Sequence, residues 1–222
     1  MGSKRLVILI SGSGSNLQAF IEKQQQGSLG GTIVSVISNN PEAYGLTRAR
    51  EAGIKAVSLD HKTHASRESF DKELAEEIKK DQPDLIILAG FMRILTPEFV
   101  QTFRGKLLNI HPSLLPKYPG LHTHKKALEN NDEFHGTSVH FVTEELDGGP
   151  LIAQSQMRLI VGSESNEENE LNEQQVMQRI QKLEHRLYPE VASWYLNNRL
   201  TMEKDGVYFD HKKLERPILF GD

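Results

Sequence analysis

Apolar residues follow two alternating patterns along the first half of the chain. Leu6–Ile10 is a continuous apolar run, and after it Leu17, Phe20 and Ile21 recur at the spacing of one helix face. Strands that are apolar throughout are buried on both faces. The pattern therefore predicts an α/β fold with a mostly parallel sheet covered by helices on both faces. The further strands and helices that it predicts are Thr32–Ser38, Ala56–Leu59, Leu85–Ala89 and Lys106–Asn109 as strands, and Pro41–Ala52, Ser66–Lys80 and a segment from Thr96 onward as helices.

The pattern changes after Asn109. Three prolines, Pro112, Pro116 and Pro119, crowd a segment that still carries apolar residues, which predicts a long ordered loop of the kind that usually has a function. Glu164–Glu173 contains five Glu and no basic residue, which predicts a solvated loop. The other expected elements are a helix at Thr123–Asn130, strands at Gly136–Val142 and Leu151–Ile160, a long helix around Val176–Leu187 and a hairpin at Thr201–Phe209.

Composition excludes several classes of protein. The chain has 222 residues, a net charge of −4 and no cysteine. Disulfides, thiolate metal sites and a cysteine nucleophile are therefore excluded, and a reducing, cytoplasmic location is expected. No apolar run approaches the ~20 residues that span a bilayer, so no membrane association is expected. The mild acidity disfavours nucleic acid as a partner, which leaves small molecules and an assembly that is a monomer or a homodimer.

The segment Ser11–Asn16 joins the first predicted strand to the first predicted helix. Its backbone N–H groups and the helix dipole would suit an anion such as phosphate. The segment lacks the third glycine of a dinucleotide fingerprint, because Leu17 stands there, and no Gly-Lys-Ser/Thr sequence follows. From these residues alone, a phosphate loop and a simple tight turn are equally supported.

Five of the nine histidines lie between positions 111 and 140. His122 and His124 could supply two metal ligands, with Asp147 or His111 as a third, but no spacing typical of a metal site supports this. An alternative needs one histidine, because His111 and Asn109 end a strand and Asp147 follows another. Asp147 would stabilise the protonated imidazole as a proton donor, and the Asn109 amide could bind an oxyanion. Equally, Asn109 and His111 could only hold the proline-rich loop in place, and Asp147 could only cap a turn.

Several long motifs resemble those of the folate-dependent formyltransferases. They occur in the expected order and cover residues 4 to about 200, with Ser13 where many relatives carry Asn. The resemblance implies a Rossmann-like formyltransferase fold forming a single domain, residues 1–222. Its parts would be a nucleotide-binding-like half at 4–105 with a phosphate loop, a catalytic and folate-binding half at 106–200, and a hairpin and tail at 201–222. The motifs are Leu108–His124, Gly136–Val142, Glu145–Pro150, Ser11–Leu17, Leu88–Leu95 and Glu184-His185.

The resemblance implies formyl transfer from the cosubstrate 10-formyltetrahydrofolate to the amine of glycinamide ribonucleotide, a step of purine synthesis that needs no metal. It assigns Asn109, His111 and Asp147 as the catalytic set, with Ser138 and His140 supporting them. Amine attack on a formamide passes through a tetrahedral oxyanion, and an amide and a protonated imidazole can stabilise that charge.

The resemblance also implies two sets of binding residues. The substrate phosphate would bind to Gly14, Ser15 and Asn16 of the first loop. The ribose and glycinamide end would bind to the long helix, through Gln181, Lys182 and Glu184. The alternative interpretation of Met92, Ile94 and Leu95 is that they are ordinary core residues with no ligand contact. The expected folate contacts are Arg67, Met92, Arg93, Ile94, Leu95, Asn109, Thr143, Glu144, Glu145, Leu146 and Asp147.

Three other functions compete with this one. Family members that deformylate formyltetrahydrofolate share the same core and typically carry an extra N-terminal domain, which is not expected here because the first predicted strand starts at Leu6. Family members that modify tRNA carry a further RNA-binding domain and a basic surface, neither of which is expected for this acidic chain. A histidine-based metallohydrolase would lose its activity in EDTA and regain it with zinc.

Overall fold

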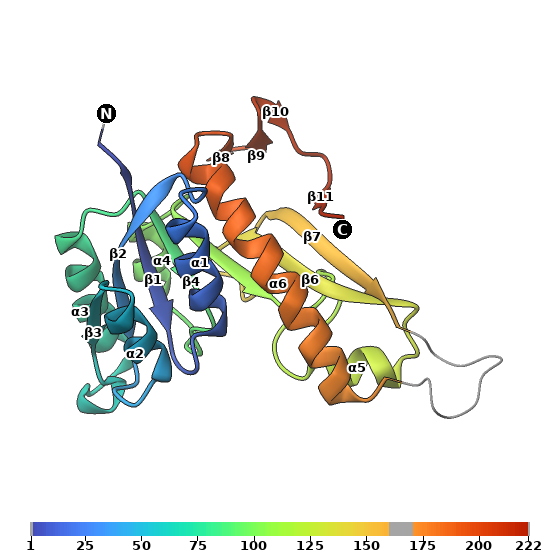
Figure 1. Cartoon of the computed structure of the whole chain (residues 1–222), viewed down its shortest axis with the longest axis horizontal. Coiled ribbons are helices and arrows are strands. Elements are labelled where there is room, and N and C mark those ends of the chain that lie inside the picture. Colours follow the sequence, from blue (N-terminus) through green and yellow to red (C-terminus); the bar gives the residue numbers. More distant parts are fainter. Residues whose placement is uncertain (1, 160–170, 222) are drawn as a thin grey trace.

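The computed structural model describes residues 2–159 and 171–221. In that part of the chain it forms an eight-stranded sheet in the order β11-β7-β6-β5-β4-β1-β2-β3 and a three-stranded sheet in the order β10-β9-β8 (Figure 1). The alternation of strand and helix predicted for the first half is confirmed. The elements there are β1 (Lys4–Ile10), α1 (Ser15–Gln25), β2 (Gly31–Ser38), α2 (Tyr44–Glu51), β3 (Lys55–Ser58), the 3-10 helix η1 (His61–Thr63), α3 (Arg67–Lys80), β4 (Leu85–Leu88) and α4 (Pro97–Thr102).

The second half departs from the parallel arrangement. β5 pairs in parallel with β4, but β6 and β7 add to the sheet in antiparallel orientation. The predicted hairpin is present as β8 and β9, and the sequence pattern missed β11, a short strand that pairs with β7 in parallel. The elements are β5 (Leu107–His111), α5 (Thr123–Glu129), β6 (Phe134–Phe141), β7 (Leu151–Arg158), α6 (Glu173–Leu196), β8 (Leu200–Glu203), β9 (Gly206–Phe209), β10 (Lys212–Lys213) and β11 (Ile218–Leu219).

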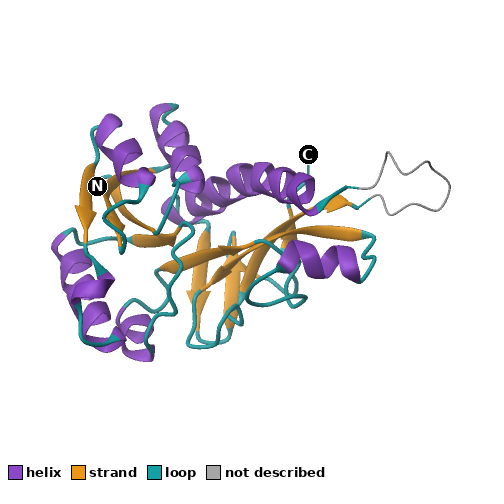
Figure 2. Ribbon diagram, turned by 90° about the horizontal axis from the view of Figure 1, so that it is seen from below, coloured by secondary structure: helices purple, strands orange, loops and turns teal. Residues whose placement is uncertain are grey.

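Helices cover both faces of the sheet, as predicted (Figure 2). Successive side chains of a strand point to opposite faces, so each strand contributes to two cores, one under each layer of helices. Leu6, Ile8 and Ile10 of β1 pack with α1, α2 and α6. Val7 and Leu9, between them in the sequence, pack with α3 and α4 on the other face. All five side chains are fully buried. The strands are therefore apolar throughout because each has a core on both sides.

The long helix α6 crosses one face of the sheet, from near α5 to β8 (Figure 1). It begins with a capping box, in which Asn172 and Gln175 each accept a hydrogen bond from the other's backbone N–H, and it contains Pro189. Its first residue, Glu173, is the end of the predicted solvated segment Glu164–Glu173, and positions 164–170 of that segment lie outside the described residues. Within the described ranges, no helix combines the length and the apolarity needed to cross a membrane.

Candidate active site

The predicted catalytic residues converge where β5 and β6 lie side by side. Asn109 pairs with His140 across the two strands, and His111 pairs with Ser138. His111 is the last residue of β5 and Asn109 lies two residues before it, towards the edge at which ligands bind in open α/β sheets. Asp147 reaches the same place from the turn between β6 and β7. Its Oδ2 lies 3.4 Å from His111 Nδ1, and both side chains are more than nine-tenths buried.

The His111 ring has an acceptor at each nitrogen. Its Nε2 lies 2.8 Å from the carbonyl oxygen of Tyr118, and its Nδ1 faces the Asp147 carboxylate. A carbonyl oxygen and an ionised carboxylate can only accept, so this arrangement suits an imidazole with a proton on both nitrogens. The predicted pairing of His111 with Asp147 is therefore present. The contribution of the Tyr118 carbonyl was not foreseen, since side-chain patterns do not report on backbone groups.

The turn that carries Asp147 is fixed against β6 by close backbone contact. Asp147 itself has a positive φ of 52°. Its Oδ2 accepts a hydrogen bond of 2.9 Å from the Gly120 N–H, which joins the turn to the proline-rich loop. A Cβ placed on Gly149 would lie 1.8 Å from the Phe141 carbonyl oxygen, so glycine is required there. This close approach is what brings the carboxylate within reach of His111.

Asn109 is oriented by His140. The Nδ1 of His140 lies 2.9 Å from the Phe141 carbonyl oxygen and therefore donates to it. Burial lowers the pKa of His140, so the ring is neutral and its Nε2 accepts. Asn109 Nδ2 lies 3.2 Å from that nitrogen and donates to it. This contact fixes which end of the amide carries the N–H groups, and Nδ2 keeps a second hydrogen for a ligand.

Ser138 holds the proline-rich loop rather than a ligand. Its hydroxyl donates to the Ser113 carbonyl at 2.7 Å and accepts from the Leu115 N–H at 3.0 Å. Gln154 of β7 donates from Nε2 to the Ser138 hydroxyl and to the Leu115 carbonyl, each at 2.9 Å. The sequence prediction omitted Gln154, because β7 also carries Ser155, Gln156 and Arg158 and the pattern does not distinguish one of these polar residues from another. This network fixes the loop that presents the Tyr118 carbonyl to His111.

The segment Ser11–Asn16 forms the tight connection expected of a phosphate loop. Gly14 precedes α1 with a φ of 70°, and α1 has no acidic residue in its first turn to compete with an anion. The Gly45 N–H of α2 donates to the Gly12 carbonyl at 3.0 Å. A Cβ on Gly14 would lie 2.7 Å from the Gly45 Cα, so α2 approaches the loop too closely for any side chain. Arg48 Nε donates to the Ser13 carbonyl at 2.9 Å and adds a positive charge beside the loop.

One face of α6 covers this loop. Gln181 Nε2 donates to the Ser15 hydroxyl at 2.9 Å, and Asn16 Nδ2 donates to Glu184 Oε2 at 3.0 Å. Burial raises the pKa of Glu184 to about 7, and the hydrogen bond from Asn16 opposes that rise. Four of the predicted substrate residues thus come together, with Gly14 beside them. Lys182 is exposed on α6, and its contact with substrate stays a prediction.

Most of the predicted folate residues lie on two loops, residues 92–95 after β4 and residues 143–147 after β6. Met92 and Ile94 are 70% and 58% exposed, so neither is a core residue, and Leu146 on the Asp147 turn is also exposed. Leu95 is partly buried against the core beneath α3 and α4. The Arg93 guanidinium lies 4.6 Å from the Phe70 ring centre. The remaining predicted contacts are Arg67, the first residue of α3, and Thr143, Glu144 and Glu145, which precede Asp147 in the turn.

The other histidines of the cluster do not assemble a metal site in the described part of the chain. His124 Nδ1 lies 2.9 Å from His135 Nε2, in a contact between the half-buried ring of His124 and the buried ring of His135. Burial lowers the pKa of His124, and burial together with His124 lowers the pKa of His135 to about 4. Among residues 2–159 and 171–221, no group of three or more His, Cys, Asp or Glu could hold a metal ion.

Known proteins resemble the chain in sequence and in fold. Residues 4–192 match the formyl transferase family. The chain is 51% identical over 209 residues to the phosphoribosylglycinamide formyltransferase of Escherichia coli, covering 94% of this chain and 95% of that protein. The solved structure of the enzyme of that name from Coxiella burnetii, 42% identical, has a TM-score of 0.90 and covers 99% of this chain and 100% of its own. A glycinamide ribonucleotide transformylase structure from Symbiobacterium toebii has a TM-score of 0.85 at 39% identity, covering 93% and 94% of the two chains.

Proposed function

The chain belongs to the formyl transferase family, and on that premise we propose that it transfers the formyl group of 10-formyltetrahydrofolate to the amine of glycinamide ribonucleotide. The products are the N-formyl ribonucleotide and tetrahydrofolate, in a step of purine biosynthesis. The observation that supports this most strongly is the 51% identity, over almost the whole of both chains, to an enzyme named for this reaction.

The reaction requires charge stabilisation and one proton movement. The glycinamide nitrogen attacks the formyl carbon and forms a new C–N bond, and the carbonyl oxygen becomes an oxyanion. The second hydrogen on Asn109 Nδ2 and the Nε2 proton of His111 are donated to that oxygen. In this structure the Tyr118 carbonyl accepts the Nε2 proton, so the oxyanion replaces Tyr118 as its acceptor. Asp147 remains beside Nδ1, 3.4 Å away, and accepts from it.

The oxyanion then collapses and the bond from the formyl carbon to the folate nitrogen breaks. A proton moves from the attacking nitrogen to the departing nitrogen, so the reaction is balanced without any other reactant. His111 can relay that proton through a water molecule, because an imidazole both gives and accepts protons near neutral pH. No covalent intermediate with the protein forms, which is consistent with a chain that contains no cysteine.

The two substrates bind next to each other, because the Met92 N–H of the folate segment donates to the Ser11 hydroxyl of the phosphate loop at 2.8 Å. The backbone N–H groups of Gly14, Ser15 and Asn16 bind the ribonucleotide phosphate at the start of α1. Gln181, Lys182 and Glu184 bind the ribose and glycinamide part. The exposed apolar side chains of Met92, Ile94 and Leu146 cover the folate, whose polar edges bind backbone groups and Arg67. We expect the enzyme to act in the cytoplasm, where purine biosynthesis takes place, as a monomer or homodimer.

A formyl-transfer assay tests the proposal. Purified protein, glycinamide ribonucleotide and 10-formyltetrahydrofolate are mixed in the presence of EDTA, and the formylated ribonucleotide is detected by mass spectrometry. The wild type and a His211→Gln control, changed at an exposed histidine, should both give product, whereas His111→Gln should give at least about 100-fold less. No product from folded wild-type protein would refute the proposal. Activity that disappears in EDTA and returns with zinc would favour the metallohydrolase alternative.

A further inference from the structure

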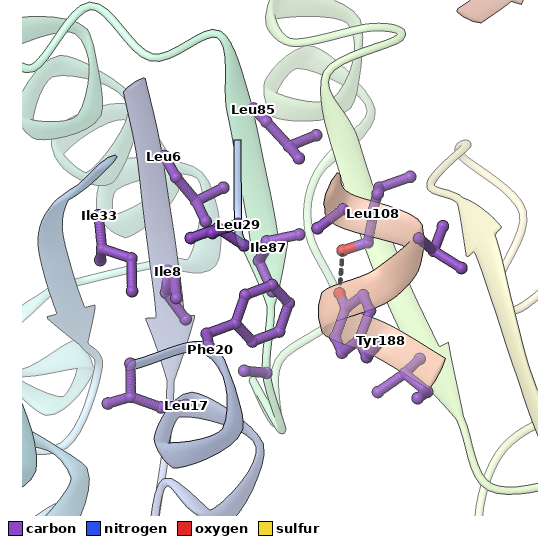
Figure 3. Packing of buried hydrophobic residues seen from close by; sticks show 14 of the residues in the cluster. Leu6, Ile8, Leu17, Phe20, Leu29, Ile33, Leu85, Ile87, Leu108 and Tyr188 are labelled. Carbon is purple, nitrogen blue, oxygen red and sulfur yellow. Dashed lines mark hydrogen bonds between the residues drawn. The ribbon is translucent and has the colours of Figure 1, made fainter. Parts of the chain in front are cut away.

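The Tyr188 hydroxyl lies between β4 and β5, next to the residue at which β4 ends. Pairing of β4 with β5 extends from Ile86–Leu107 to Leu88–Asn109, where β4 ends. The hydroxyl donates to the Leu108 carbonyl at 2.7 Å and lies 3.2 Å from the Leu88 carbonyl, so it connects α6 to the ends of both strands. Figure 3 shows Tyr188 reaching from α6 to Leu108. No part of the proposed reaction uses this residue.

Packing holds the Tyr188 ring in place. The side chain is fully buried, and its ring makes an edge-to-face contact with Phe20 of α1, with ring centres 5.2 Å apart (Figure 3). Burial raises the pKa of Tyr188 well above its ordinary value, so the hydroxyl keeps its proton and remains a donor. Because hydrogen bonds are directional, a buried hydroxyl in a fixed position restricts the orientation of the carbonyl group that accepts from it.

The carbonyl that it holds belongs to the peptide group of Asn109. The carbonyl of Leu108 and the N–H of Asn109 share one planar unit, so a hydrogen bond to the first fixes the orientation of the second. Asn109 is partly exposed, and its side-chain amide donates to His140 at 3.2 Å. A small rotation of the peptide would move this amide relative to His140 and to the reacting oxygen.

We propose that Tyr188 is a positioning residue, whose hydrogen bond to the Leu108 carbonyl sets the side-chain amide of Asn109 in the orientation that donates to the oxyanion. This inference rests on the role of Asn109 in the proposed function. Tyr188 also lies on the face of α6 that carries Gln181 and Glu184, because residues seven and four positions apart share one face. The same helix face therefore fixes both the phosphate loop and the catalytic strand.

Tyr195 provides a matched control on the same helix. Its hydroxyl donates to the Gly105 carbonyl at 3.0 Å, near the opposite end of β5 from Asn109. Tyr188→Phe and Tyr195→Phe each remove one hydroxyl from a carbonyl and leave the ring. Both substitutions are expected to lower the midpoint of thermal unfolding, so a loss of stability does not distinguish the two variants. Only Tyr188→Phe should disturb the side-chain amide of Asn109.

The first experiment compares the kinetics of the two variants. Tyr188→Phe should lower kcat about tenfold or more, with KM for both substrates within about twofold of wild type, because misorientation of a catalytic group affects the reaction step. Tyr195→Phe should retain its kcat. An unchanged kcat in Tyr188→Phe, or an equal loss in both variants, would overturn the proposal.

A double variant tests whether Tyr188 acts through Asn109. In an Asn109→Ala background, Tyr188→Phe should cause no further loss of kcat, since the group that it positions is already absent. An additional loss as large as in the wild type would show that Tyr188 acts by another route and would contradict the proposal. The cycle requires measurable residual activity, which the oxyanion contact of His111 supplies.

A measurement without substrate separates this inference from the proposed function. The side-chain amide NMR signals of Asn109, identified by their loss in Asn109→Ala, should shift in Tyr188→Phe and stay in place in Tyr195→Phe. Unshifted signals in Tyr188→Phe would refute the positioning role, whatever the enzyme catalyses. The other combination is also informative. If the signals shift in Tyr188→Phe but the wild-type protein makes no formylated product, the positioning contact is supported and the proposed function is refuted.

Discussion

The proposed phosphate loop and the proposed catalytic cluster lie on the same sheet but consist of different chemical groups. The loop offers backbone N–H groups at the start of α1, and it requires glycine at position 14, where φ is 70° and α2 leaves no room for a Cβ. The cluster consists of side chains that further contacts hold in place: the Tyr118 carbonyl and Asp147 hold His111, and His140 holds Asn109. Binding an anion needs a local backbone shape, whereas the reaction needs groups brought together from several segments.

The difference predicts that substitutions in the two regions alter different kinetic constants. A change in the cluster should lower kcat, because its contacts strengthen only as the oxyanion forms. A change in the loop should raise KM for the ribonucleotide, because the phosphate is bound equally before and during the reaction. The predictions below test this separation, beginning with the largest expected effect.

Asp147→Asn should lower kcat by about 100-fold, because the substituted amide no longer compensates the charge on the His111 ring. Steady-state rates at saturating concentrations of both substrates test this effect. Asp205→Asn, which removes an exposed carboxylate paired with Lys213 on the hairpin, serves as the control and should keep the wild-type kcat. The coupling between Asp147 and His111 is refuted if Asp147→Asn keeps the wild-type kcat.

Glu184→Gln should stabilise the protein above neutral pH while weakening substrate binding. The pKa of Glu184 rises from its ordinary value of 4.5 to about 7 on folding. Between these values the folded state binds more protons than the unfolded state, so the contribution of Glu184 to stability decreases as pH rises through that window. Glutamine keeps an acceptor for Asn16 and carries no charge. The free energy of unfolding at pH 8 should therefore increase by about 3 kcal/mol, as measured by urea denaturation.

The effect of Glu184→Gln should fall to about 1 kcal/mol at pH 5, where the folded wild type already holds the proton and only the unfolded chain, with its ordinary pKa of 4.5, is partly ionised. Glu190→Gln on the same helix is the control and should give no gain, because Glu190 accepts a hydrogen bond of 2.7 Å from Lys23. A gain for Glu184→Gln that is the same at pH 5 and pH 8 would show that its origin is not the buried charge.

Gly14→Ala should raise KM for glycinamide ribonucleotide about tenfold and leave kcat within about twofold of wild type. An alanine at a φ of 70° is strained, and its Cβ would meet the Gly45 backbone at 2.7 Å, so the loop N–H groups must move. Gly27→Ala is the matched control, since Gly27 has a φ of 71° and nothing within 4 Å of a Cβ. If Gly14→Ala lowered kcat and left KM unchanged, the loop would not be a separate binding region.

The sequence was sufficient for the parallel half of the sheet and for the residues of the cluster. Runs such as Leu6–Ile10 directly report burial on both faces, and the motifs around His111 are long enough to identify a family. The short β11 was missed because two residues carry no periodicity. The Tyr118 carbonyl and the Tyr188 hydroxyl were missed because each contact involves a backbone carbonyl, which leaves no pattern in the sequence.

The most direct test of the separation between the two regions is calorimetric titration of glycinamide ribonucleotide into His111→Gln and Gly14→Ala, beside the kcat of each variant. We predict that His111→Gln binds the ribonucleotide with a Kd within about twofold of wild type while its kcat falls at least about 100-fold. Gly14→Ala should bind about tenfold more weakly and retain its kcat. A Kd that rises in His111→Gln in proportion to the loss of kcat would contradict the account, because binding and reaction would then depend on the same groups.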